Sequence, residues 1–155
     1  MRSFLPRTLI ASLALAATAG HAAGFAPGEW RHDSKLISAE VPGVPEFLVR
    51  MMAGGGARKS CFPAGVAARS QEALLADDSK ASCRTSRLTM AADGQLEYVA
   101  ICINQRFPDP MTVTSTGRWT PTSYSFRAIT TGTRKGKPVK VVTEGSGRRT
   151  AVACS

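Results

Sequence analysis

From Cys83 to the C-terminus, apolar and polar residues alternate along the chain in runs that are separated by turn-forming residues. Met111, Val113 and Trp119 are apolar, for example, while three threonines and Arg118 occupy positions between them. A period of two is typical of β-strands that bury one face. Short turns at residues 120–123 and 134–137 interrupt the runs. The sequence therefore predicts consecutive antiparallel strands joined by hairpins.

The first half of the chain adds further strands and one or two short helices. Pro45 and the glycines at 54–56 favour a helix between them, because proline suits the first helical turn and glycine follows the last. The predicted elements are strands at 30–37 and 57–62, a helix at 45–52 and a helical turn at 70–75 that is only an appendage. The predicted fold class is mainly β: an antiparallel meander of six to eight strands, curled into a sheet or open barrel, with one or two short helices.

Asp93-Gly94 marks the tip of one predicted hairpin. A two-residue turn there places Leu88 and Met90 on one face, matched by Val99, Ile101 and Ile103 on the partner strand. The same turn brings Cys83 and Cys102 to one face, diagonal to each other. A three-residue loop would place the two cysteines on opposite faces.

The N-terminus has the pattern of a secretory signal peptide. Arg2 and Arg7 precede a short apolar run, which ends in small residues. Cleavage after Ala22 is preferred and cleavage after Ala19 is the alternative. The run is too short to span a bilayer, and no cysteine near the cleavage site offers a lipid anchor. The chain is thus predicted to comprise a signal peptide, 1–22, and a single disulfide-linked β-rich domain, 23–155, located in the periplasm.

Four cysteines follow the predicted cleavage site: Cys61, Cys83, Cys102 and Cys154. An even number in an oxidising compartment predicts two disulfides. The chain has no C-x-x-C motif, and the cysteine spacings do not suit a zinc site. The preferred pairs are Cys83–Cys102 and Cys61–Cys154, and the alternative is Cys61–Cys83 with Cys102–Cys154.

The chain is basic, with 20 Lys and Arg against 11 Asp and Glu. Removal of residues 1–22 takes away Arg2 and Arg7 and lowers the net charge from +9 to +7. Basic residues gather late in the chain, and the candidate binding surface among them is Arg134, Lys135, Lys137, Arg148 and Arg149. Such a surface in an exported protein indicates binding to an anionic envelope component or to an acidic protein. The simpler interpretation is that these residues are a solvated strand face that keeps the protein soluble. Nucleic acid is not an expected partner, because interleaved aromatic residues are missing.

The predicted helix at 45–52 carries an apolar stripe that includes Phe47, Leu48 and Met51. The stripe is expected to pack across the open sheet as part of the core. Alternatively, these three residues form the lid of a pocket.

Five short motifs occur in order along the chain: Pro27-Gly28-Glu29-Trp30, Val41-Pro42-Gly43-Val44-Pro45, Cys61-Phe62-Pro63, Gly94 between Cys83 and Cys102, and Gly147-Arg148 before Cys154. In this order of motifs the chain resembles a family of exported bacterial proteins filed as domain of unknown function 3617. It departs from the family at Arg149, where an aromatic or aliphatic residue is common, and in its more basic C-terminal half. The resemblance implies a periplasmic location and a β-rich fold, and it brings no established activity.

No catalytic constellation is visible. With both predicted disulfides formed no free thiol remains, and His32 is the only histidine after residue 22. A lone strand histidine is more often a packing or surface residue than a base. The sequence therefore predicts a non-catalytic envelope protein that binds through a basic surface, with no metal and no cofactor. The alternative is a small carrier that encloses an apolar ligand between the curled sheet and the short helix.

Overall fold

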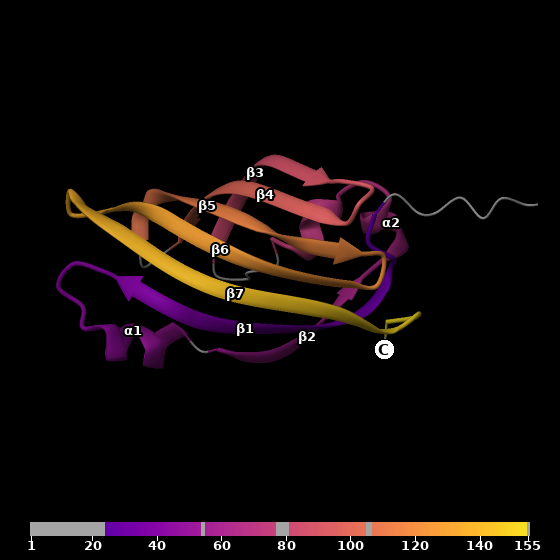
Figure 1. The fold of residues 1–155 in the computed structure, drawn as a ribbon, viewed down its shortest axis with the longest axis horizontal. Helices are drawn as coiled ribbons and strands as arrows, with labels where there is room; N and C mark the ends of the chain where they lie inside the picture. Colours follow the sequence, from indigo (N-terminus) through magenta and orange to yellow (C-terminus); the bar gives the residue numbers. More distant parts are fainter. Residues whose placement is uncertain (1–23, 54, 77–80, 105–106, 155) are drawn as a thin grey trace, which may run out of the picture.

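The structure is a computed structural model that describes residues 24–53, 55–76, 81–104 and 107–154, so the predicted signal peptide at 1–22 lies outside it. The described residues form one antiparallel sheet of seven strands, two short helices and one 3₁₀ turn (Figure 1). The strands are β1 (Gly28–Glu40), β2 (Gly56–Phe62), β3 (Ala81–Met90), β4 (Gln95–Asn104), β5 (Phe107–Thr120), β6 (Ser123–Arg134) and β7 (Lys137–Ala151). The helices are α1 (Glu46–Ala53) and α2 (Ala64–Ala67), and the 3₁₀ turn is η1 (Gln71–Leu74).

The strand order is β2-β1-β7-β6-β5-β4-β3. Strands β3 to β7 form a continuous meander, and β1 returns to pair with β7. The sheet curls without closing, because β2 and β3 remain as its two edges. The predicted fold class, an open antiparallel meander with short helices, is confirmed.

Side chains alternate between an inner, concave face and an outer face of the sheet. On β5, Met111 and Ser115 are buried on the inner face, whereas Thr112, Thr114 and Thr116 are exposed on the outer face. The alternation predicted from the sequence thus separates a core side from a solvent side.

The main core fills one end of the inner face. Phe25 lies at its centre, with its ring edge-on to Trp30, Trp119 and Tyr124 at centroid distances of 5.6, 5.9 and 5.7 Å. Edge-to-face contacts of this kind add about 0.5–1.5 kcal/mol each to the burial of apolar area. The buried members of this aromatic core are Phe25, Trp30, Phe62, Leu74, Leu96 and Tyr124.

The segment α2–η1 closes this end of the inner face. Leu74 of η1 is only 2% exposed and belongs to the aromatic core. The prediction that residues 70–75 are an appendage is therefore wrong. Leu74 does not act alone, because the partly buried Leu75 and the partly buried Val66 of α2 pack against the same cluster.

β7 runs without interruption through Gly145 and Gly147. Both glycines face the inner side, where the ring of Phe126 lies against Gly145 and the ring of Tyr124 against Gly147. A Cβ atom on either glycine would overlap with these rings. The glycines thus make room for two aromatic rings on the neighbouring strand β6.

The β3–β4 hairpin has a longer loop than the predicted two-residue turn. Residues 91–94 form the loop, in which the Gly94 N–H donates to the Ala91 carbonyl, and Met90 pairs with Leu96. This register turns Val99, Ile101 and Ile103 to the outer face, contrary to the prediction. The inner positions of β4 belong to Leu96, Tyr98 and Ala100.

A bulge between Thr85 and Arg87 shifts the β3–β4 register by one residue. Beyond it, Cys83 lies directly opposite Cys102 instead of diagonal to it. Without the bulge, the loop would have placed the two cysteines on opposite faces, because side chains alternate with a period of two.

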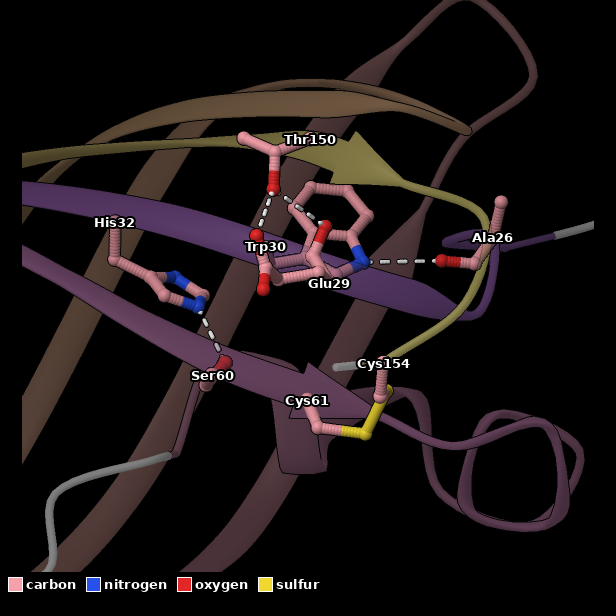
Figure 2. Close-up of a disulfide and its surroundings, with 8 residues drawn as sticks. All are labelled: Ala26, Glu29, Trp30, His32, Ser60, Cys61, Thr150 and Cys154. Carbon is pink, nitrogen blue, oxygen red and sulfur yellow. Dashed lines mark hydrogen bonds between the residues drawn. A yellow bond between two sulfur atoms is a disulfide. The ribbon is translucent and has the colours of Figure 1, made fainter.

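The two disulfides are Cys61–Cys154 and Cys83–Cys102, which are the preferred pairs of the sequence analysis. Figure 2 shows Cys61 at the end of β2 joined to Cys154, which follows β7. Because β1 lies between β2 and β7, this bridge ties an edge strand to the C-terminal segment across β1. The second bridge joins β3 to β4 and secures the other edge.

The two bridges are expected to contribute unequally to stability. Cys61–Cys154 spans 93 residues and Cys83–Cys102 spans 19, so loop-closure entropy gives about 4.5 and about 3 kcal/mol, respectively. The variant C61S/C154S should therefore unfold at lower urea concentration than C83S/C102S. Urea unfolding followed by tryptophan fluorescence checks the order, and equal midpoints would contradict it.

Candidate functional site

The hairpin between β6 and β7 presents basic residues at one extremity of the molecule (Figure 1). Its turn consists of Lys135 and Gly136, whose φ angles are +51° and +73°. Positive φ at both central residues is typical of the type I′ turn, whose twist matches that of the flanking strands. Arg134 and Lys137 pair directly below the turn. Lys135 and Lys137 are both exposed.

The hairpin is fixed to the connection between β1 and α1. One guanidinium N–H of Arg134 donates to the Pro42 carbonyl at 2.8 Å. A second apolar cluster lies next to this contact and joins Val139 of β7 to Val41, with Val49 of α1 packed against it. We call α1, residues 41–45 and residues 133–140 the helix–hairpin end. It is held together by a side-chain hydrogen bond and by buried apolar contacts.

Basic residues outnumber acidic residues at the helix–hairpin end. The charges balance within α1, where Arg50 and Glu46 form an ion pair at 2.7 Å. On the strands, Lys140 lies opposite Glu40 in the β1–β7 register. Of the described residues in and beside this end, five are basic (Arg50, Arg134, Lys135, Lys137, Lys140) and three are acidic (Glu40, Glu46, Asp109).

The structure does not bring all five candidate basic residues together. Arg148 lies eleven residues beyond Lys137 on the extended strand β7, which is about 35 Å along the sheet. Its side chain is exposed on the outer face. Arg149, next to it, lies at the end of the sheet that holds the aromatic core. Arg134, Lys135 and Lys137 therefore form one surface, and Arg148 and Arg149 lie elsewhere.

Arg149 is partly buried at the closed end of the sheet. Its Nε is buried and has no hydrogen-bond partner among the described residues. A Cβ on Gly28 would come within 2.8 Å of this nitrogen, so the glycine leaves space for the arginine side chain. Arg149 is thus packed into the fold and does not extend a basic surface.

Helix α1 contacts the sheet through a different face from the predicted one. Val49 packs against the second apolar cluster, and Leu48 is half-buried. Phe47 and Met51 are 63% and 72% exposed. The expectation that Phe47 and Met51 pack into the core is therefore wrong, and the alternative, a pocket lid, stays a prediction. The helix is too short to bury more than a narrow stripe.

His32 is buried at 4% exposure on the inner face of β1. Its Nδ1 is hydrogen-bonded to the Tyr124 hydroxyl at 2.5 Å and its Nε2 to the Ser60 hydroxyl at 2.7 Å (Figure 2 shows the Ser60 contact). No signal in the sequence pointed to these partners, because they come from β6 and β2 and meet His32 only through the sheet register.

The contact between Ser60 and His32 resembles part of a hydrolase triad. A triad histidine carries a carboxylate at Nδ1, which orients the ring and stabilises its charged form. Here a tyrosine hydroxyl occupies Nδ1. Ser60 borders a hollow of about 370 Å³ between β2 and the α2–η1 segment, and apolar residues such as Phe62 and Leu74 line it. The arrangement is that of a buried histidine with both ring nitrogens satisfied.

A shallow hollow of about 520 Å³ lies over β1, β7, β6 and β5. The ion pair between Arg127 and Glu144, at 2.8 Å, borders it together with Asp33 and Lys35. Its lining therefore mixes both signs of charge, which does not select an anionic or a cationic ligand.

Within the described part of the chain, no group of three or more His, Cys, Asp or Glu side chains is placed to hold a metal ion. In the same ranges, no helix has the length and apolar character needed to cross a membrane.

The model of the family DUF3617, described as a protein of unknown function, matches residues 25–154. No curated protein and no solved structure matches the chain.

The hydrogen bond between Tyr124 and His32 is expected to stabilise the fold. Tyr124→Phe leaves a buried imidazole nitrogen without this hydroxyl and should lower the free energy of unfolding by about 1–3 kcal/mol. The matched control is Tyr98→Phe, because Tyr98 is equally buried and its hydroxyl is 3.5 Å from that of Thr85, a weak contact. Urea unfolding compares the two variants, and equal losses would contradict a special role for the His32 contact.

Proposed function

The chain belongs to the DUF3617 family of proteins of unknown function, and we propose that it is an exported, non-catalytic binding protein of the cell envelope. In this proposal it binds an anionic envelope component or an acidic protein through a basic surface, which consists of Arg134, Lys135 and Lys137. The observation that carries the proposal is the fixed hairpin that holds these three side chains at one extremity of the molecule.

Export is supported by the N-terminal sequence and by the cysteines. Arg2, Arg7 and the apolar run that follows have the pattern of a signal peptide. All four cysteines are paired, and disulfides form and persist in oxidising compartments such as the periplasm. In this proposal the chain is cleaved after Ala22 and acts in the periplasm.

Charge and shape support binding through the hairpin. Without residues 1–22 the chain carries a formal net charge of +7, which attracts anionic partners over distances of about a Debye length. The turn at Lys135 and Gly136 projects at one end of the strands (Figure 1), so its charges can approach a large partner without a clash from the rest of the fold. The contact of Arg134 with Pro42 keeps the hairpin in one orientation.

The environment of His32 supports the absence of catalysis in this proposal. The ring is buried, and hydroxyl groups hold both of its nitrogens. At Nδ1 the imidazole has the Tyr124 hydroxyl, where a triad histidine has a carboxylate that stabilises its charged form, and this favours a structural role for its contact with Ser60.

If the chain is exported and cleaved after Ala22, the mature protein has a defined mass. We expect the protein recovered from the periplasm to begin at Ala23 and to weigh four hydrogens less than the reduced chain. Intact mass spectrometry under non-reducing conditions measures both. A protein that keeps residues 1–22 and stays in the cytoplasmic fraction would contradict export.

Charge reversal at the hairpin is expected to weaken envelope binding. The variant K135D/K137E reverses two exposed charges, and aspartate tolerates the left-handed backbone at position 135. Because each basic residue near an anionic surface contributes about 1 kcal/mol, binding should weaken at least about tenfold. The measurement is sedimentation with isolated cell envelopes at low ionic strength, about 50 mM, where screening is weak.

The matched control is R84E/R148E. Both residues are exposed on the outer face, and neither belongs to the hairpin, so the net charge falls equally while the hairpin stays basic. This variant should retain more binding than K135D/K137E. Equal binding by the wild type and K135D/K137E would overturn the proposal.

A further inference from the structure

Phe47 and Met51 form an exposed apolar pair on α1. They are 63% and 72% exposed and lie four residues apart, which places them on one face of the helix. Val49 anchors the opposite side of α1 to the second apolar cluster. Neighbouring phenylalanine and methionine side chains that are exposed to solvent are typical of a surface that binds an apolar partner.

This apolar pair lies at the same end of the molecule as the basic hairpin. Figure 1 shows α1 beside the end of β1, at the end where the β6–β7 turn also lies. The hydrogen bond from Arg134 to Pro42 and the contacts among Val41, Val139 and Val49 hold the two parts together. Apolar and cationic side chains are therefore presented on one rigid unit.

The net charge of the helix–hairpin end is positive. Arg50 is neutralised by Glu46 within α1, and Glu40 lies opposite Lys140. Asp109 accepts a hydrogen bond from Thr133 beside the hairpin. Lys135 and Lys137, at the outermost position, then give the helix–hairpin end its excess of positive charge.

We propose that the helix–hairpin end docks on the surface of a bilayer that contains anionic lipid. Phe47 and Met51 insert at the boundary between headgroups and acyl chains, and Lys135 and Lys137 lie against the lipid phosphates. This inference rests on the proposed function and names its anionic partner as a lipid surface. It uses the established pairing of apolar insertion with electrostatic attraction in interfacial helices.

A lipid surface fits these features better than an acidic protein. The apolar pair lies on a two-turn helix at the edge of the molecule, and the charged turn projects nearby. A fluid surface can accept two isolated apolar side chains and separated cations without a complementary shape. Stable protein interfaces instead need a larger and well-packed apolar centre.

Neither contribution is strong enough alone, so loss of either should release the protein. Substitution of two partly inserted apolar side chains by polar ones should weaken binding about tenfold. Reversal of the two lysine charges should weaken binding by about the same factor. The test is cosedimentation with vesicles of equal parts phosphatidylglycerol and phosphatidylcholine, with pure phosphatidylcholine as the neutral surface. All variants are compared in the same processed form, with the mass determined, so that residues 1–22 cannot account for a difference.

The variants separate insertion from charge. F47S/M51S should lose about tenfold in affinity for the anionic vesicles. Its matched control is Val152→Ser, because Val152 is 79% exposed at the opposite end of β7 and should not touch the bilayer. K135D/K137E tests the charges, with R84E/R148E as control, and circular dichroism shows that each variant is folded.

The outcomes distinguish this inference from the proposed function. If F47S/M51S binds anionic vesicles like the wild type while K135D/K137E does not, insertion is wrong and the basic surface stands. If the wild type binds envelopes but no anionic vesicle, the partner is another anionic component and the inference is overturned. If it binds neither, both proposals fail. Equal binding to neutral and anionic vesicles would also overturn the inference.

Discussion

The packing of Tyr124 and Phe126 against Gly147 and Gly145 is the contact on which the rest of the structure depends. Because the glycines have no side chains, the two rings of β6 lie flat over β7 on the inner face. Tyr124 then reaches Trp30, Phe25 and His32, and so links the middle of the sheet to β1 and to the N-terminal segment. Any side chain at these glycines would push the rings away and open the aromatic core.

This packing gives the two ends of the sheet different properties. At one end, the aromatic core, the α2–η1 segment and the Cys61–Cys154 bridge close the inner face. The other end has only a small aliphatic cluster beneath α1, and it carries the exposed Phe47 and Met51. Stability is therefore concentrated at the closed end. At the opposite end, side chains that do not belong to the core can be exposed. A binding surface at that end therefore costs the fold the least stability.

The sequence was sufficient for the fold class because period-two alternation and hairpin turns are local signals. It predicted the helix at 45–52 and the strand positions from neighbouring residues alone, whereas the preferred pair Cys83–Cys102, argued from a two-residue turn, forms because the bulge offsets the longer loop. It could not predict the loop at 91–94 or the bulge beside Ser86, and these two features together decide which residues of β4 face inward. The partners of His32 could not be predicted for the same reason, since Ser60 and Tyr124 approach it only after the register of three strands is set. For the candidate site, charge along the chain identified the basic residues, while the length of the extended strand β7 separates Arg148 and Arg149 from the hairpin.

The topology also explains how a composite surface can arise from distant parts of the chain. Phe47 and Lys135 are far apart in sequence, but β1 and β7 are antiparallel neighbours, so the segment after β1 and the segment before β7 emerge at the same end. The apolar residues of α1 and the lysines of the hairpin are therefore brought together by strand pairing alone. Arg134 then bonds to the Pro42 carbonyl, which converts this proximity into a fixed orientation. A surface built in this way needs little buried area of its own, because the sheet that supports it is already secured at the other end by the aromatic core.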